Sequence, residues 1–164
     1  MNENELTGLL ESLRRMGSDD FNVEVKESAT TLSRDVWETV SAFANTAGGI
    51  IVLGVSERAG FVPVANFETE KVLNQFVAGM GDAGGRGKLA NPPKYTIERV
   101  ELRGTVVLVI TIEELDPSSK PCYVIERGAQ GGSYKRIDDK DVPLSSTEVL
   151  ALPSYERKAS FPYR

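Results

Sequence analysis

The chain has 164 residues, a length at which a single domain can bury a substantial core. Hydrophobic residues make up 40% of it and charged residues 26%, as in an ordinary globular protein. No apolar run reaches the roughly 20 residues that a membrane span requires, so we expect no membrane partner. The chain contains no histidine, which excludes histidine-based catalytic triads and most zinc sites. Its single cysteine, Cys122, cannot form an internal disulfide and so favours a reducing, cytoplasmic location.

The net charge of −5 has the wrong sign for a protein that binds phosphate backbones over its whole surface. The charge is unevenly distributed, however. Residues 1–57 carry four basic and ten acidic side chains, whereas residues 58–112 carry seven basic and five acidic ones. We therefore expect any contact with nucleic acid to be local.

The first 17 residues predict an amphipathic helix, because leucines recur there at helical spacing and Gly17 suits the position after a last turn. Apolar and polar residues alternate over residues 21–26, a pattern typical of a half-buried strand. The polar face of that strand carries Glu24 and Lys26 side by side.

A second helix should follow, with Ser33 as its N-cap and Asp35 in its first turn, where the helix dipole favours an acid. Gly48 and Gly49 end this helix. Residues 50–55 come next and are apolar on both faces, which predicts a central strand covered on both sides.

Residues 68–78 predict a third helix, and residues 79–93 predict a mobile, glycine-rich loop that holds Arg86 and Lys88. Further elements are expected in the C-terminal part: a hairpin over residues 94–112, a short strand over 133–137 and a helical turn over 145–152.

Together these elements predict an α/β fold of the α+β kind, in which a mixed β-sheet is flanked by helices. We expect three parts: an amphipathic helix at residues 1–17, one domain at residues 18–152, and a basic and aromatic tail or linker at residues 153–164.

The most specific pattern lies between Val40 and Val55, where Val-Ser-Ala-Phe-Ala-Asn-Thr-Ala-Gly-Gly precedes an apolar strand and Gly-Val. Its amide residue, Asn45, can bind backbone groups of a loop, and its glycines let the backbone turn tightly into the sheet. These structural residues are Asn45, Gly48, Gly49 and Gly54. On physical grounds alone, the pattern is explained by the packing of the core and needs no functional site.

The same pattern resembles the signature of the Schlafen AlbA-like family, also called the divergent AlbA_2 domain. Two further blocks occur in the matching order: Val23–Glu27 resembles the Glu-x-Lys strand of the family, and Gly132–Arg136 resembles its closing aromatic and basic segment. The resemblance covers residues 18–150.

The resemblance implies two activities. Bacterial members of the family are generally regarded as DNA-binding modules of transcriptional regulators or ATPases. Some Schlafen relatives instead cleave structured RNA with three carboxylates and a divalent metal. The corresponding positions here are Asp19, Glu24 and Glu57, although the first and third differ in side-chain length from the commonest choice. Mg²⁺ or Mn²⁺ would be the metal. Alternatively, Glu24 and Lys26 form a solvated salt bridge that contributes little.

Five cations are candidate phosphate contacts: Lys26, Arg86, Lys88, Lys135 and Arg136. Two of them lie in the glycine-rich loop, which can follow a sugar–phosphate backbone but carries little information about bases. The alternative is an ordinary solvated loop.

The leading hypothesis is a non-catalytic nucleic-acid-binding domain of a transcriptional regulator, with DNA favoured over RNA and no cofactor. A second hypothesis is a metal-dependent nuclease that acts on structured RNA or single-stranded nucleic acid through Asp19, Glu24 and Glu57. A third is a protein-interaction module or homo-oligomer whose interface is the N-terminal leucine stripe.

Overall fold

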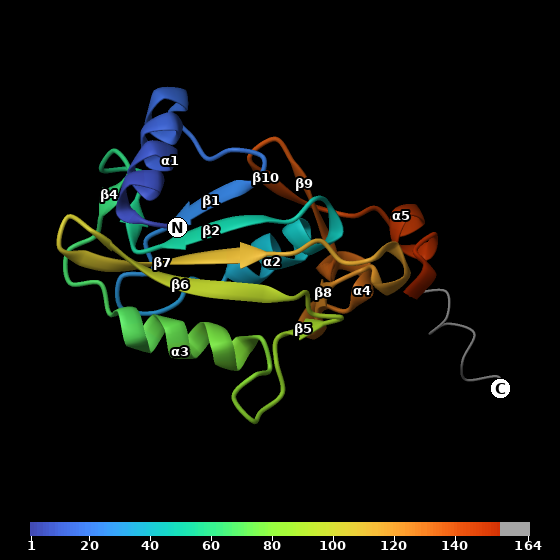
Figure 1. Ribbon diagram of the computed structural model, residues 1–164. Helices are drawn as coiled ribbons and strands as arrows, with labels where there is room; N and C mark the ends of the chain where they lie inside the picture. The colour runs from blue at the N-terminus through green and yellow to red at the C-terminus, as the bar shows by residue number, and fades with distance from the viewer. Residues whose placement is uncertain (155–164) are drawn as a thin grey trace.

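The computed structural model describes residues 1–154, so most of the basic tail expected from the sequence lies outside the described residues. Its centre is a mixed four-stranded sheet in the order β1-β2-β7-β6 (Figure 1). The first pair is parallel and the other two are antiparallel. The strands are β1 (Val23–Lys26), β2 (Gly49–Leu53), β7 (Thr105–Ile112) and β6 (Tyr95–Leu102). The predicted mixed sheet with flanking helices is confirmed.

Shorter elements surround this sheet. Two-stranded pairs within residues 1–154 are β3 (Val55–Ser56) with β4 (Val62–Pro63), β5 (Leu89–Ala90) with β8 (Tyr123–Val124), and β9 (Tyr134–Ile137) with β10 (Lys140–Pro143). The helices are α1 (Glu3–Met16), α2 (Val36–Asn45), α3 (Thr69–Gly79), α4 (Ala129–Gly132) and α5 (Ser146–Leu150), with 3₁₀ turns at Pro117–Ser119 and Ile125–Arg127. No helix in this part of the chain is long and apolar enough to cross a bilayer.

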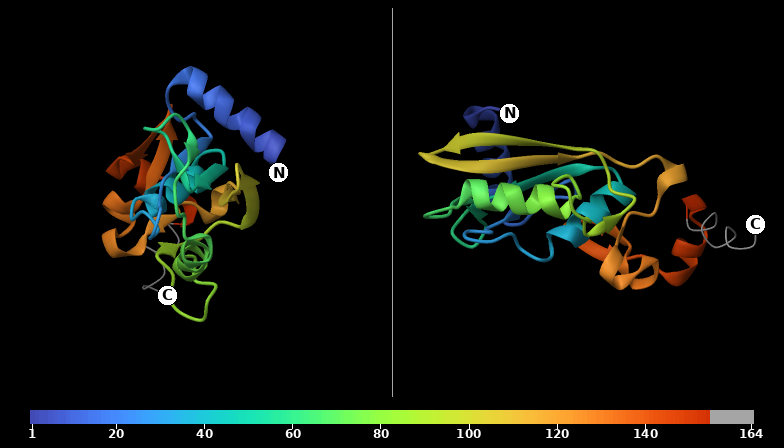
Figure 2. Two further views of the ribbon diagram at one scale, coloured as in Figure 1. Left: turned by 90° about the vertical axis from the view of Figure 1, so that its left-hand side faces the viewer. Right: turned by 90° about the horizontal axis from the view of Figure 1, so that it is seen from below.

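Helices cover both faces of the sheet, with α1 on one side and α3 on the other (Figure 2). The alternation of side chains along β2 divides the core between these faces. Ile51 and Leu53 pack in the cluster beneath α2 and α3, whereas Val52 packs in the cluster beneath α1. All three are fully buried, as expected for a central strand.

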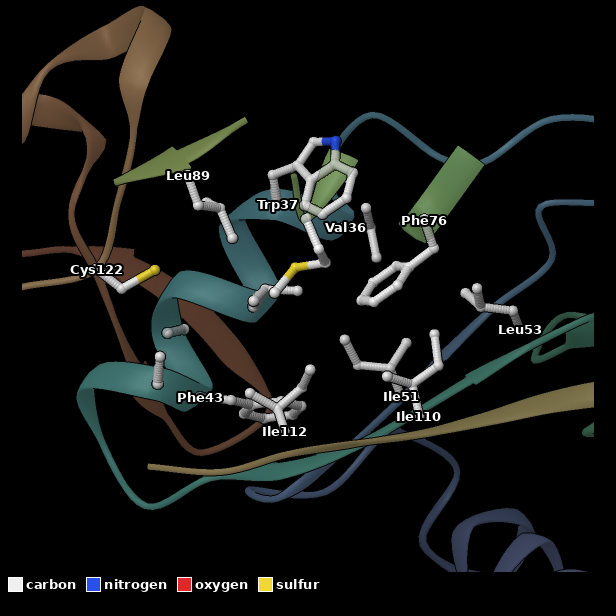
Figure 3. Close-up of a cluster of buried hydrophobic side chains, with 14 of the residues drawn as sticks. Val36, Trp37, Phe43, Ile51, Leu53, Phe76, Leu89, Ile110, Ile112 and Cys122 are labelled. Atoms are coloured by element: carbon white, nitrogen blue, oxygen red, sulfur yellow. The ribbon is translucent and has the colours of Figure 1, made fainter. Parts of the chain in front are cut away.

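The core beneath α2 and α3 is built around aromatic side chains (Figure 3). Trp37 stacks on Phe76 with ring centroids 5.4 Å apart. A Cβ at Gly79 would lie 2.1 Å from the Trp37 ring, so this last residue of α3 must lack a side chain. The start of α2 and the end of α3 are therefore held in a fixed relation.

The junction between α2 and β2 is fastened by one amide side chain. The Asn45 Nδ2 donates to the backbone oxygens of Cys122 and Tyr134, both at 2.9 Å, and its Oδ1 accepts from the Cys122 N–H at 2.8 Å. Gly48 has a φ of +70°, and its backbone passes so close to β7 that a Cβ would lie 2.7 Å from the Ile112 oxygen. This junction thus ties α2 to segments far along the chain.

The start of α2 differs from the sequence-based expectation. Asp35, and not Ser33, directly precedes the first helical residue, Val36. The Ser33 hydroxyl bonds the Ser28 hydroxyl at 2.8 Å, and an Asp35 oxygen lies 3.1 Å from the Lys26 Nζ. The side chains of Ser33 and Asp35 therefore bond to residues outside the helix. Capping preferences depend on the local sequence alone and cannot predict such partners.

The leucine stripe of α1 faces the chain's own sheet. Leu6, Leu10 and Leu13 are between 0% and 3% exposed and lie in one cluster with residues of β1, β2, β6 and β7. The stripe is therefore occupied within the monomer, and the proposed use of this stripe as an interaction surface is wrong.

Candidate nucleic-acid interface

The three acidic residues singled out from the sequence come from separate segments that meet near β1. Asp19 precedes β1 and is buried, with its Oδ1 accepting the Val25 N–H at 3.1 Å. Glu24 lies on β1, and Glu57 follows β3. Glu24 and Glu57 both line a shallow hollow of about 270 Å³, the carboxylate hollow.

Burial, then a hydrogen bond with Glu24, and then the charges of Glu24 and Glu57 raise the pKa of Asp19 to about 9. Carboxylates that share one site cannot all ionise at neutral pH, so this cluster holds a proton or balances its charge with a cation. The cluster nevertheless does not fit a metal as it stands, because residues 1–154 contain no group of three such side chains placed to hold one.

The oxygens of Glu24 are already engaged by cations. Its Oε1 lies 2.8 Å from the Arg136 Nη1, and its Oε2 lies 3.7 Å from the Lys26 Nζ. The side chains of Glu24 and Lys26 are only 14% and 10% exposed. The pair is therefore largely buried, which differs from the solvated salt bridge considered above.

Arg136 is a structural residue. Its side chain is 1% exposed and its guanidinium lies over the Phe43 ring, 5.0 Å from the centroid. It pairs with two carboxylates and donates to three backbone oxygens, those of Asp20, Phe21 and Val23. The expectation that Arg136 contacts phosphate is wrong, because no ligand can reach a guanidinium enclosed in this way.

Two of the three lysines predicted to contact phosphate have acidic neighbours. Lys26 lies between Glu24 and Asp35, and Lys135 pairs with Glu148 at 2.8 Å. A phosphate would have to compete with these carboxylates, so neither lysine is a strong anion site on its own.

A second hollow, of about 500 Å³, is lined by more cations than acids and is called here the cationic cleft. Three separate segments form it: the start of α2, the loop after α3 and the turn after β8. Its lining residues are Arg34, Trp37, Glu38, Arg86, Gly87, Lys88, Val124, Ile125, Glu126 and Arg127. The loop after α3 projects from the molecule and returns at β5 (Figure 1).

Most cations of the cleft have no partner within the described residues. Arg127 pairs with Glu38 at 3.2 Å and donates to the Tyr134 hydroxyl. By contrast, within residues 1–154 no hydrogen bond or ion pair engages the exposed side chains of Arg34, Arg86 and Lys88. Unpaired cations in a concave surface raise the local positive potential and attract anions.

The ends of the loop are fixed, in contrast to the mobile loop expected from the sequence. The Lys88 N–H donates to the Gly79 oxygen at 2.6 Å, and the Ile125 N–H donates to the Lys88 oxygen at 3.0 Å. A Cβ at Gly87 would lie 2.8 Å from two backbone atoms, the Gly79 oxygen and the Gly81 nitrogen. Arg86 and Lys88 are thus mounted on backbone that is joined both to α3 and to the turn after β8.

The start of α2 separates the two hollows. Ser33 and Asp35 line the carboxylate hollow, whereas Arg34 and Trp37 line the cationic cleft. Arg86 and Lys88 were singled out from the sequence, but Arg34 and Arg127 were not. These two are isolated basic residues, and only the tertiary structure brings them beside the loop.

Residues 19–145 match the protein family described as Schlafen, AlbA_2. The chain belongs to this family. A search of curated proteins gave no match to this AlbA_2 chain.

Solved structures resemble this AlbA_2 domain. One is the N-terminal domain of a protein from Nitrosomonas europaea that is named for its relation to the ATP-dependent DNA helicase RecG. It has a TM-score of 0.61 and 28% identity, and the match covers 82% of this chain and 90% of that one. Another is the DIP2311 protein from Corynebacterium diphtheriae, with a TM-score of 0.51 and 15% identity. That match covers 94% of this chain and 28% of the other, and it shows the fold alone.

Proposed function

We propose that this AlbA_2 chain is a nucleic-acid-binding domain whose cationic cleft holds phosphates of the ligand. The observation that carries the proposal is the convergence of Arg34, Arg86 and Lys88, all unpaired within the described residues, on one hollow of an otherwise acidic chain. Contacts of this kind neutralise phosphates and release counterions, which is the main source of affinity for nucleic acids. Membership of the AlbA_2 family and the RecG-related neighbour support a role connected with nucleic acid.

DNA is the favoured ligand, because the neighbour with 28% identity is named for its relation to a DNA helicase. The domain would bind without a cofactor and without chemistry, as part of a transcriptional regulator in the cytoplasm. Phosphate contacts carry no sequence information directly, so the cleft would bind many sequences with similar affinity. Any choice of target would come from elsewhere, and homo-oligomerisation stays a prediction without an assigned surface.

The test is a salt titration of binding to fluorescent single-stranded DNA, duplex DNA and RNA. The double variant Arg86→Gln/Lys88→Gln should weaken binding and reduce the steepness of log K against log salt by about 1.4 on single strands, at about 0.7 for each lost phosphate contact. Arg15→Gln/Arg103→Gln removes the same charge outside the cleft and should leave binding nearly unchanged. Absence of binding to all three ligands at low salt would refute the proposal.

A metal-dependent nuclease is a second candidate, favoured by the position of Glu24 and Glu57 in one hollow near the buried Asp19. Asp19, Glu24 and Glu57 would be the residues that hold Mg²⁺ or Mn²⁺, after a rearrangement of their side chains. The test is incubation of tRNA and single-stranded DNA with Mn²⁺. Cleavage that is lost in Glu57→Gln, an exposed position, would support the nuclease. Intact substrate, or equal cleavage by the variant, would eliminate it.

A further inference from the structure

The cationic cleft carries more positive charge than one internal phosphate of a strand requires. Its lining contains four cations and two carboxylates, a surplus of two positive charges. An internal phosphodiester has a single negative charge, whereas a terminal phosphate carries about −1.5 to −2 at neutral pH. The surplus of the cleft therefore matches a terminal phosphate, and it could also accept part of a polyphosphate.

The size of the cleft also favours a terminal phosphate. A hollow of about 500 Å³ lies within the range of about 300–1,000 Å³ that is typical of sites for small molecules. One nucleotide with its phosphates can therefore enter it. A double helix instead presents its phosphates on a convex surface and cannot bring several of them into a single hollow.

The cleft presents charged side chains and only a small aromatic surface on which a base could stack. Trp37 is 9% exposed because it packs against Phe76 and Gly79, so only a small part of its ring faces the cleft. Three of the four cations are arginines, which bind phosphate oxygens through paired N–H groups. Recognition should therefore depend on the phosphate and little on the base.

One cation of the cleft is held in place before a ligand arrives, and two others stand on fixed backbone. Arg127 is positioned by Glu38 and the Tyr134 hydroxyl. Arg86 and Lys88 flank Gly87, whose backbone lies against the last turn of α3. Because this backbone is already fixed, ordering the loop costs little entropy when a phosphate binds.

We infer that the cationic cleft is a site for the terminal phosphate of a nucleotide, either at the phosphorylated end of a strand or on a free nucleoside triphosphate. This inference rests on the proposed function and assigns the part of a nucleic acid that the cleft binds. The residues that form the site are Arg34, Arg86, Lys88 and Arg127.

The experiment compares binding of the whole chain to three single-stranded DNA 12-mers of one sequence, which carry a 5′-phosphate, a 3′-phosphate or two hydroxyl ends. A phosphorylated 12-mer should bind about tenfold more tightly than the unphosphorylated one, the effect of one additional charge-assisted hydrogen bond. ATP and inorganic phosphate are then added as competitors. Competition by ATP identifies the free nucleotide as a ligand, whereas resistance to ATP restricts the site to strand ends.

Two glycine variants supply a matched comparison that retains all charges. Gly87→Ala pushes the loop away from α3 and should abolish the preference for a phosphorylated end. Gly85→Ala lies in the same loop, where an added Cβ meets nothing within 4 Å, and should keep it. If Gly87→Ala fails to fold, Arg86→Gln/Lys88→Gln tests the same preference.

The outcomes separate the inference from the function on which it rests. Equal binding of phosphorylated and unphosphorylated 12-mers overturns the inference and leaves nucleic-acid binding intact. A preference that Gly87→Ala and Arg86→Gln/Lys88→Gln both retain overturns it as well, since the terminal phosphate then binds elsewhere. Failure of the three 12-mers, and of duplex DNA and RNA, to bind at low salt overturns both.

Discussion

Two buried ionisable residues, Asp19 and Arg136, lie at the point where β9 meets the start of β1. The negative charge of Glu24 acts on Asp19, and Glu24 in turn pairs with Arg136. The arginine supplies positive charge to a crowded acidic site, so its role is to stabilise the fold around the carboxylates. Its neighbour Lys135 is half-buried and pairs with Glu148.

The charge of Asp19 makes the stability of the chain depend on pH. Its pKa of about 9 in the folded protein exceeds its ordinary value of 3.8, so the folded chain binds an additional proton between these limits. The free energy of unfolding therefore falls as pH rises through this window. Asp19→Asn cannot ionise and should gain stability relative to the natural chain between about pH 5 and 8, by at most about 1.4 kcal/mol per pH unit. Urea unfolding in metal-free buffer measures this difference, and a difference that is constant with pH would contradict the account.

Loss of Arg136 should be costly. Arg136→Met leaves Glu24 and Asp141 without their buried cation, which should lower the free energy of unfolding by about 3–5 kcal/mol. Lys135→Met, on the adjacent residue of β9, should change it by less than about 1 kcal/mol, because its ion pair is much more exposed to solvent than that of Arg136. Chemical denaturation of both variants measures these two changes in the free energy of unfolding. Similar losses for the two would mean that the buried ion pairs of Arg136 do not stabilise the fold.

At the scale of elements, α1 forms one face of the core. Leu10→Ala should therefore lower the free energy of unfolding by about 2–5 kcal/mol, as expected for removal of a buried leucine. Met16→Ala, at a position that is 54% exposed, should have little effect. Thermal or urea unfolding measures both. If Leu10→Ala changes the oligomeric state while stability is preserved, α1 serves as an interface after all.

The elements with a strong local pattern could be predicted from the sequence. The hairpin expected over residues 94–112 forms as β6 and β7, because its alternating apolar residues pair across one tight turn. The buried strand after Gly48 and Gly49 forms as β2, since its apolar residues face both halves of the core.

Other parts of the fold depend on contacts between distant segments. The turn at Ile125–Arg127, which forms one wall of the cationic cleft, has no periodic pattern and is fixed by the Lys88 oxygen. The burial of Arg136 likewise depends on carboxylates and backbone oxygens from β1 and β10. The aromatic and basic segment therefore predicted a phosphate contact at Arg136, whereas in the fold Arg136 forms buried ion pairs. Two of the five predicted phosphate contacts, Arg86 and Lys88, lie in the cationic cleft.

At the scale of the whole molecule, an acidic chain concentrates unpaired positive charge in one hollow beside α2. The neighbouring carboxylate hollow has the opposite sign, so a nucleic-acid strand should be held on one side of the α2 start and repelled on the other. The proposed position of the ligand is therefore the cationic cleft, on one side of the α2 start.

The most direct test maps the ligand on the protein by following backbone amide chemical shifts during titration with single-stranded DNA. The largest changes are expected at residues 85–88 and 124–127, which come from two separate segments of the cationic cleft, with little change along α1. Large changes confined to α1 or to the β6–β7 hairpin, with residues 85–88 and 124–127 unaffected, would contradict this position of the ligand.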